Sequence, residues 1–138
     1  MNQHLTARQL TDIANEFGTP VYVYHAEKIA EQYQKLKSAF RESDTVFFYA
    51  CKALTNVNIL KYLRSLGACL DCSSINEVKI GLLAGFSPQK ILYTSNGIAF
   101  DEIEEARNAG VHINIDSLSN LEKFGKTYGH GYTVGIRL

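Results

Sequence analysis

The chain has 138 residues, of which 46% are hydrophobic, and its 14 basic residues balance its 14 acidic ones. This length and apolar content suffice for one globular core, while the zero net charge and the scattered basic residues give no electrostatic footprint for nucleic acid. No apolar stretch approaches the roughly 20 residues of a membrane span, and residues 1–10 are too polar for a signal peptide. We therefore predict a cytoplasmic protein that has neither a membrane nor a nucleic-acid partner.

The first 40 residues predict a helix, a strand and a second helix. The first helix is expected over Thr6–Phe17, because Thr6 and Gln9 match a capping box and Gly18 supplies a stop. Residues 19–24 then form an apolar and aromatic run with proline near its start, which predicts a strand. The next helix is predicted by apolar residues at helical spacing, which are Ile29, Tyr33, Leu36 and Phe40.

Strands and helices alternate in the rest of the chain. Strands are expected at Val46–Cys51, Cys69–Cys72, Ile91–Thr94, Ile113–Asp116 and Thr133–Leu138. Helices are expected between them at Val57–Leu66, Asn76–Ala84, Asp101–Asn108 and Leu118–Tyr128. Strands separated by single helices with short connections require parallel pairing through right-handed crossovers. This α/β pattern predicts a βα-barrel or a doubly wound sheet.

The number of strands and the last segment bear on domain organisation. Five strands are expected where a (β/α)8 TIM barrel needs eight. The sequence ends inside the apolar segment Thr133–Leu138, which would leave an unpaired strand edge. We therefore expect the front part of a longer protein, with an opening helix and strand in residues 1–24 and, if the sheet is a barrel, the first elements of a partial TIM barrel in residues 25–138.

Lys52 is the first candidate for a chemical role. It stands near the end of Thr45–Ala53, an apolar and aromatic run that has the composition of a buried strand. Burial disfavours the charged ammonium form, so an amine in this position would be a nucleophile suited to Schiff-base chemistry. The alternative is a lysine that extends from the end of the strand into solvent.

Other polar residues stand at or just beyond the predicted strand ends, where TIM barrels bind their ligands. They are Asp71, Asn96, Asp116 and Arg137. Arg137 lies in an apolar strand, so its guanidinium requires an anionic partner or an open cavity. Asp116 and Ser117 precede a helix and are predicted to cap it, whereas Asn96 begins an ordinary Asn-Gly turn.

Two further motifs have structural alternatives. Ser74 and Glu77 match a capping box, so Glu77 either caps the following helix or belongs to the site. Cys69 and Cys72 have C-x-x-C spacing, but positions three apart on a strand point to opposite faces, which separates the two sulfurs. We therefore predict free, buried thiols and no metal site.

Four segments together resemble the diaminopimelate decarboxylases, and they occur in the order and spacing of that family. They are residues 17–24, Tyr49–Leu54, Leu70–Glu77 and Ile113–Ser117. The resemblance covers essentially the whole chain. In the wider group of fold-type III pyridoxal-phosphate enzymes, which includes ornithine decarboxylase and alanine racemase, a Tyr-Ala-x-Lys-Ala element marks the cofactor lysine. Here that element is Tyr49-Ala50-Cys51-Lys52-Ala53.

The resemblance implies an alanine racemase-like barrel, pyridoxal 5'-phosphate as cofactor, and decarboxylation of meso-2,6-diaminopimelate to L-lysine and carbon dioxide in lysine biosynthesis. It implies that Lys52 is the catalytic residue and holds the cofactor as a Schiff base. Asp71 and Glu77 match the acidic residues of the family's D-x-x-S-x-x-E segment, near the cofactor. Ala50 would lie in the strand under the cofactor ring, and Arg137 matches an arginine of the fifth barrel strand that projects toward the cofactor.

The resemblance also implies a homodimer, in which a C-terminal β-domain and a second protomer complete the site. Because the family's phosphate loop and substrate-reading groups follow the fifth strand, we expect the 138 residues to be inactive by themselves. The chain departs from the family at Ile75-Asn76, where Gly-Gly is common, and at Thr94-Ser95-Asn96, where His-Gly-Asn is common. An ornithine- or arginine-type decarboxylase, an amino-acid racemase of the same fold and a non-catalytic pyridoxal-phosphate carrier remain as alternatives.

Overall fold

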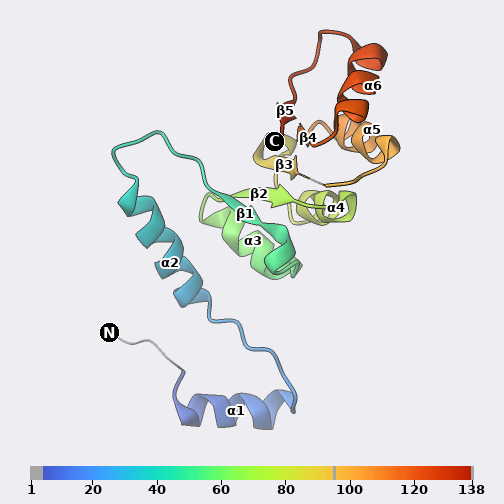
Figure 1. Ribbon diagram of the computed structural model, residues 1–138. Coiled ribbons are helices and arrows are strands. Elements are labelled where there is room, and N and C mark those ends of the chain that lie inside the picture. The colour runs from blue at the N-terminus through green and yellow to red at the C-terminus, as the bar shows by residue number, and fades with distance from the viewer. Residues whose placement is uncertain (1–4, 95, 138) are drawn as a thin grey trace. The chain divides into compact units, whose positions relative to one another are not determined.

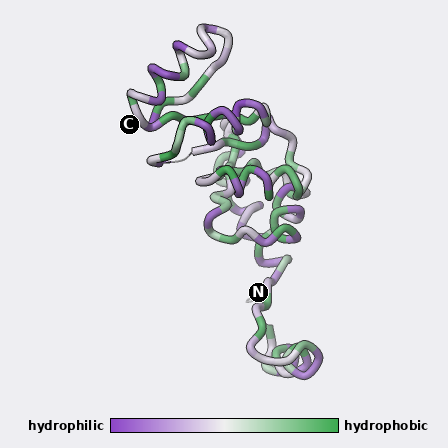
Figure 2. The backbone as a smooth tube through the Cα atoms, turned by 90° about the vertical axis from the view of Figure 1, so that its right-hand side faces the viewer, coloured by the Kyte–Doolittle hydropathy of each residue, from purple (hydrophilic) through white to green (hydrophobic). Residues whose placement is uncertain are grey.

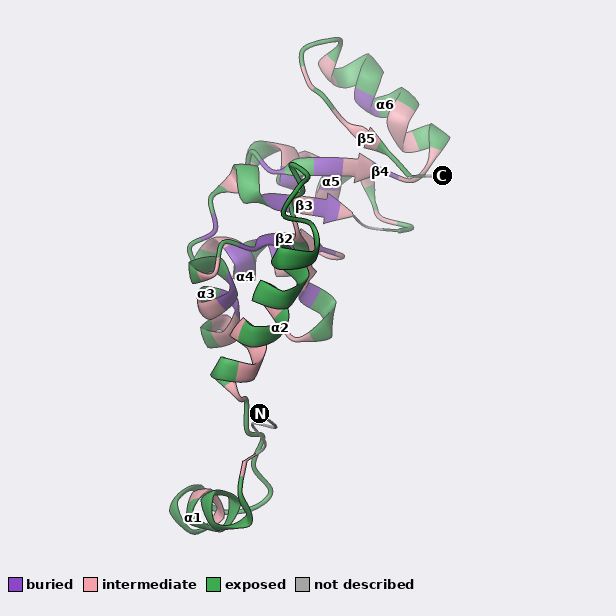
Figure 3. Cartoon of the chain, turned by 90° about the vertical axis from the view of Figure 1, so that its left-hand side faces the viewer, coloured by how far each residue is buried: buried purple, intermediate pink, exposed green. Residues whose placement is uncertain are grey.

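The computed structural model describes residues 5–94 and 96–137, and the chain divides into two compact units between Ser43 and Asp44. The first unit contains helices α1 (Ala7–Phe17) and α2 (Ala26–Ala39) (Figure 1). The predicted capping box is confirmed, since Thr6 N donates to Gln9 Oε1 at 2.8 Å and Gln9 N donates to Thr6 Oγ1 at 3.2 Å. Neither helix contains a buried residue (Figure 3).

The strand predicted over residues 19–24 is wrong. This segment has no regular secondary structure, and its four apolar residues Val21, Tyr22, Val23 and Tyr24 are 42%, 89%, 40% and 43% exposed. A strand forms only where a neighbouring strand exchanges backbone hydrogen bonds with it. Within the described residues, the sheet consists of five other segments. The composition of residues 19–24 is that of a strand, but none of these five segments pairs with them.

The second unit contains a parallel sheet whose spatial order follows the chain, β1-β2-β3-β4-β5. Its strands are β1 (Phe48–Ala50), β2 (Cys69–Cys72), β3 (Ile91–Thr94), β4 (His112–Ile115) and β5 (Gly135–Ile136). The α/β prediction is confirmed, although β1 and β5 are shorter than expected. The register places Ala50 beside Asp71 and Thr94 beside Asn114, so strand ends of neighbouring strands meet at one edge.

Four helices connect the strands (Figure 1). They are α3 (Val57–Ser65), α4 (Ile75–Leu83), α5 (Phe100–Asn108) and α6 (Leu118–Tyr128). Helix α4 packs on β2 and β3, and α5 packs on β4. Each of these two helices is followed, just after its C-cap residue, by a glycine with positive φ, 87° at Gly85 and 75° at Gly110, where a residue with a side chain would be strained. None of the described helices is long and apolar enough to span a membrane.

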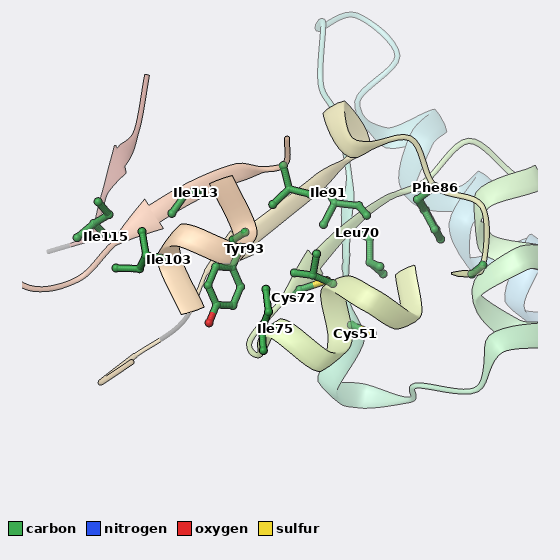
Figure 4. Packing of buried hydrophobic residues seen from close by; sticks show 14 of the residues in the cluster. Cys51, Leu70, Cys72, Ile75, Phe86, Ile91, Tyr93, Ile103, Ile113 and Ile115 are labelled. Carbon is green, nitrogen blue, oxygen red and sulfur yellow. The ribbon is translucent and has the colours of Figure 1, made fainter. Parts of the chain in front are cut away.

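The hydrophobic core lies between the strands and their helices. Alternate strand residues, among them Leu70, Cys72, Ile91, Tyr93 and Ile113, are almost fully buried and belong to one cluster (Figure 4). In Figure 2, hydrophobic and hydrophilic residues alternate along the helices, as expected of elements with one apolar face. The intervening strand residues Asp71, Thr94 and Asn114 are half-buried and point to the opposite face of the sheet. The polar face is therefore separate from the core.

Gly81 permits α4 to lie close to the sheet, and we expect Gly81→Ala to destabilise the protein by about 1–2 kcal/mol. A Cβ at this position would lie 2.5 Å from Leu70 Cδ2 and 3.3 Å from Ile91 Cδ1, and both of those side chains are fully buried. Urea unfolding measures the effect. Gly125→Ala in α6 is the matched control, because no heavy atom lies within 4 Å of a Cβ built there. The control should stabilise the protein by about 0.5–1 kcal/mol, and an equal gain for Gly81→Ala would contradict the packing argument.

Candidate active site

A pocket of about 460 Å³ lies at the carboxyl ends of the strands, in the second unit. It is lined by Lys52, Asp71, Ser73, Thr94, Asn96 and Arg137. Four of these residues were predicted from their positions at strand ends, and the structure brings them together. Ser73 and Thr94 were not predicted, although Thr94 is the last residue of β3 and its position would have identified it. Among the described residues, the lining does not include the predicted Ala50, Glu77 or Asp116.

Lys52 does not lie in a buried strand, which corrects the expectation from composition. Strand β1 ends at Ala50, and Lys52 is the middle residue of a 3₁₀ turn over Cys51–Ala53. Its side chain is exposed and lines the pocket, so the buried amine expected from composition is not observed. Two hydrogen bonds close the turn: Leu54 N donates to Cys51 O at 3.1 Å, and Tyr49 Oη donates to Leu54 O at 3.4 Å.

Asp71 brings a carboxylate to the pocket from the middle of the sheet. It is paired in register with Ala50 on one side and Leu92 on the other. Its Oδ1 atom is buried and accepts no hydrogen bond from the described residues. A buried carboxylate oxygen without a partner is costly, so this atom marks a place where a ligand donor would be stabilised.

Glu77 supports the pocket from behind instead of lining it. Ser74 caps α4, because Glu77 N donates to Ser74 Oγ at 3.2 Å. The Glu77 carboxylate accepts from Ser73 N at 2.7 Å and from Ser73 Oγ at 3.3 Å, through Oε2 in both cases. Ser74 therefore caps the helix as the alternative interpretation predicted, but the Glu77 carboxylate binds Ser73, the residue before the cap, and so holds in place the turn whose Ser73 lines the pocket.

Arg137 reaches the pocket from the residue after β5. Its backbone N donates to Ile115 O at 3.0 Å, and its side chain is exposed toward the pocket, which is the open cavity that a guanidinium in an apolar strand requires. Leu138 and Ser95, which the predicted strand and loop included, lie outside the described residues.

Asp116 does not cap α6, which corrects the prediction made from its position. The cap is Ser117, whose Oγ accepts from Asn120 N at 3.3 Å. The Asp116 carboxylate instead accepts from Gly97 N at 2.8 Å. It therefore holds the loop that follows β3, next to the pocket residue Asn96. Asp116 and Ser117 both precede the helix and both have short polar side chains that can cap it. Their positions in the sequence therefore could not show which of them forms the cap.

The three cysteines are free and buried, as predicted. Cys51 and Cys72 nevertheless lie beside one another, and their sulfur atoms and a carboxylate oxygen of Glu77 are all within 4.8 Å. The spacing argument concerned only Cys69 and Cys72, so it missed the contact between Cys72 of β2 and Cys51 in the turn after the neighbouring strand β1. Burial, with a smaller contribution from the Glu77 charge, raises the pKa of Cys51 to about 11. Burial and the neighbouring Cys51 raise the pKa of Cys72 as well.

These raised pKa values predict a loss of stability at high pH. Unfolded Cys51 ionises near its ordinary value of 9.0, whereas the folded thiol keeps its proton until about pH 11. Stability is therefore complete below pH 9 and falls between about pH 9 and 11, by on the order of 2 kcal/mol, because the unfolded state alone releases protons. Urea midpoints measured against pH, with reductant and chelator present, should show this fall. The double variant Cys51→Ser/Cys72→Ser should show a smaller slope, and an identical slope would contradict the assignment.

Comparison with known proteins identifies the family. Residues 26–138 match the family described as "Pyridoxal-dependent decarboxylase, pyridoxal binding domain". The chain is 39% identical over 129 residues to diaminopimelate decarboxylase of Methanothermobacter thermautotrophicus, which covers 92% of this chain and 30% of that protein. It superimposes on Helicobacter pylori diaminopimelate decarboxylase complexed with L-lysine with a TM-score of 0.83 at 30% identity, over 94% of this chain and 34% of that one.

Related decarboxylases with other substrates share the same fold. Lysine/ornithine decarboxylase of Vibrio vulnificus, complexed with cadaverine, matches with a TM-score of 0.86 at 25% identity, over 100% of this chain and 38% of that one. The chain thus spans about a third of the length of the relatives that it matches. The match over residues 26–138 covers most of the chain, and the five parallel strands agree with it. The chain belongs to the pyridoxal-dependent decarboxylases, whose pyridoxal-binding domain uses pyridoxal phosphate as its cofactor.

Proposed function

We propose that this chain supplies the cofactor-binding lysine of a diaminopimelate decarboxylase, and that Lys52 is that lysine. The observation that carries the proposal is the meeting of an exposed amine, an unpartnered carboxylate oxygen and a guanidinium around one pocket at the strand ends. In parallel α/β barrels this is the end at which ligands bind. The Tyr-Ala-x-Lys-Ala element, observed here as the end of β1 and the turn after it, supports the same assignment.

The residues present fit pyridoxal phosphate. The cofactor is an anionic aldehyde with a polar ring, and the pocket offers one amine, one guanidinium and the polar side chains of Ser73, Thr94 and Asn96. The unpartnered Asp71 Oδ1 provides an acceptor for a proton donor in the pocket. When bound, pyridoxal phosphate supplies an electron sink for the electrons that remain when carbon dioxide leaves an amino acid.

The chain's own residues would divide the remaining work. Lys52 presents its amine on a short hydrogen-bonded turn, where it can bind a carbonyl carbon and afterwards hold or release a proton. Asp71 would orient the Lys52 amine or another donor through Oδ1. Arg137 would bind an anionic group at the open side of the pocket. Glu77 would fix the Ser73 turn from outside the pocket, which makes it a positioning residue.

The substrate is proposed from the relatives. Diaminopimelate decarboxylases match the chain at 30–39% identity, which favours meso-diaminopimelate as substrate and L-lysine as product. The fold match to a lysine/ornithine decarboxylase favours a second candidate, in which L-lysine or L-ornithine is the substrate.

Separate assays of the three substrates decide between the candidates. The complete gene product, loaded with pyridoxal phosphate, is incubated separately with meso-diaminopimelate, L-lysine and L-ornithine, and released carbon dioxide and amine products are quantified. We expect carbon dioxide and L-lysine from meso-diaminopimelate alone. Cadaverine or putrescine as the main product would establish the second candidate. Absence of carbon dioxide from all three substrates, in protein that binds the cofactor, would contradict both candidates.

The lysine assignment has its own test, which does not depend on turnover. Borohydride reduction of the cofactor-loaded protein, followed by peptide mass mapping, should place one pyridoxyl group on Lys52. A pyridoxyl group on another lysine, such as the exposed Lys61 of α3, would refute the assignment.

A further inference from the structure

A second group of potential ligand side chains lies outside the pocket lining. It consists of Cys51, Cys72 and Glu77, and one potential ligand atom from each lies within 4.8 Å of the other two. Both thiols are fully buried in the hydrophobic core, and Glu77 is half-buried (Figure 4). None of the three lines the pocket, and the proposed decarboxylation uses only Glu77, as a support for the Ser73 turn, so it does not account for the two thiols.

The register of the sheet brings the two thiols together. Ala50 of β1 pairs with Asp71 of β2, and Cys51 and Cys72 are the next residue on each side. Because side chains alternate along strands, Asp71 faces the pocket while Cys72 faces the helices. Cys51 also points into this core, although Lys52 beside it is exposed. Glu77 lies in the first turn of α4, which packs on β2.

We propose that Cys51, Cys72 and Glu77 form a binding site for a thiophilic divalent metal ion of the zinc type. Two sulfurs and one carboxylate oxygen are ligands that Zn²⁺ accepts, and a water molecule would complete a tetrahedral set. Binding forms two metal–sulfur bonds and one metal–oxygen bond, and it releases both thiol protons to the solvent. The charge of the ion is then balanced by two thiolates, with the Glu77 carboxylate as a third anionic ligand.

The geometry requires only a small contraction. With Zn–S bonds of about 2.3 Å and Zn–O bonds of about 2.0–2.2 Å, ligand atoms of a tetrahedral site are about 3.5–3.8 Å apart. The three atoms here are already within 4.8 Å, so rotamer adjustments of roughly 1 Å suffice. Within the described part of the chain, both hydrogen bonds of the Glu77 carboxylate use Oε2, which leaves Oε1 for the ion.

Cobalt titration of the protein tests the site, since Co²⁺ substitutes for Zn²⁺ and reports its ligands by absorption. Under a non-thiol reductant, we expect one Co²⁺ per chain, a sulfur-to-cobalt charge-transfer band, visible bands of tetrahedral Co²⁺, and loss of all these bands when Zn²⁺ is added. Zn²⁺ should also raise the unfolding midpoint, because it binds only the folded arrangement. Absence of the charge-transfer band in the folded, reduced protein would overturn the proposal.

Variants assign the ligands. Cys51→Ser and Cys72→Ser should each abolish the charge-transfer band, whereas Cys69→Ser should keep it. Cys69 is a matched control because it is also buried and lies on the same strand as Cys72. If circular dichroism shows that a serine variant has not folded, the corresponding alanine variant, Cys51→Ala or Cys72→Ala, is used in its place. Glu77→Gln should keep the band with weaker affinity. Equal losses in the Cys69 variant, or full binding without Cys51 or Cys72, would overturn the assignment.

Discussion

Replacement of Lys52 by alanine should abolish covalent cofactor attachment and lower decarboxylation by about 10³-fold, within the range observed when a group that transfers protons is removed. The reason is chemical, because Lys52 is the amine that lines the pocket beside Asp71. The fold should be retained, since the Lys52 side chain is exposed and the turn is held by backbone and Tyr49 hydrogen bonds. Absorption of the bound cofactor and borohydride trapping measure covalent attachment, and carbon dioxide release measures decarboxylation.

Two further variants separate the chemistry of Lys52 from its charge. Lys52→Arg keeps a positive charge but should be as inactive as the alanine variant, because a guanidinium remains protonated and is not a nucleophile. Lys61→Ala removes an exposed lysine of α3 and should leave trapping and activity unchanged. If Lys52→Arg retained substantial activity, the residue would act only as a charge and the proposed covalent role would be wrong.

Replacement of Arg137 by alanine should weaken pyridoxal phosphate binding by about 10–100-fold, because hydrogen bonds to charged groups contribute roughly 1.5–3 kcal/mol. The urea midpoint should change little, since the side chain is exposed and the backbone bond from Arg137 N to Ile115 O does not depend on it. Arg137→Lys should recover little affinity, because an ammonium cannot reproduce the planar pair of donors. Equilibrium dialysis of the cofactor measures the affinity.

An arginine at the other end of the strands supplies the control. Arg64 lies in α3 and donates to Gly85 O at 3.1 Å, and Gly85 lies in the loop between α4 and β3. Arg64 does not line the active-site pocket. Arg64→Ala removes the same charge and should leave cofactor affinity unchanged. Comparable losses in the two variants would indicate a general effect of net charge. Lost stability with unchanged affinity in Arg137→Ala would indicate a purely structural role.

Much of the fold could be predicted because its signals are local. The apolar segments Cys69–Cys72 and Ile91–Thr94 form strands at the predicted positions, and Leu118–Tyr128 forms the predicted helix. Capping side chains such as Thr6 and Ser74 act within one helical turn, so sequence spacing identifies them directly. The alternation of short strands and helices then determines parallel pairing, which in turn places the strand-end residues Lys52, Asp71 and Arg137 at one edge of the sheet.

The tertiary structure decided what depends on partners distant in the sequence. Residues 19–24 have strand composition but pair with no strand among the residues that the structure describes. Lys52 follows an apolar run yet lies on an exposed turn because β1 ends at Ala50. Asp116 binds Gly97 instead of a helix end, and Cys51 meets Cys72 only through the register of β1 and β2. Backbone pairing and burial are properties of contacts between segments, whereas composition and spacing report only what a segment can do alone.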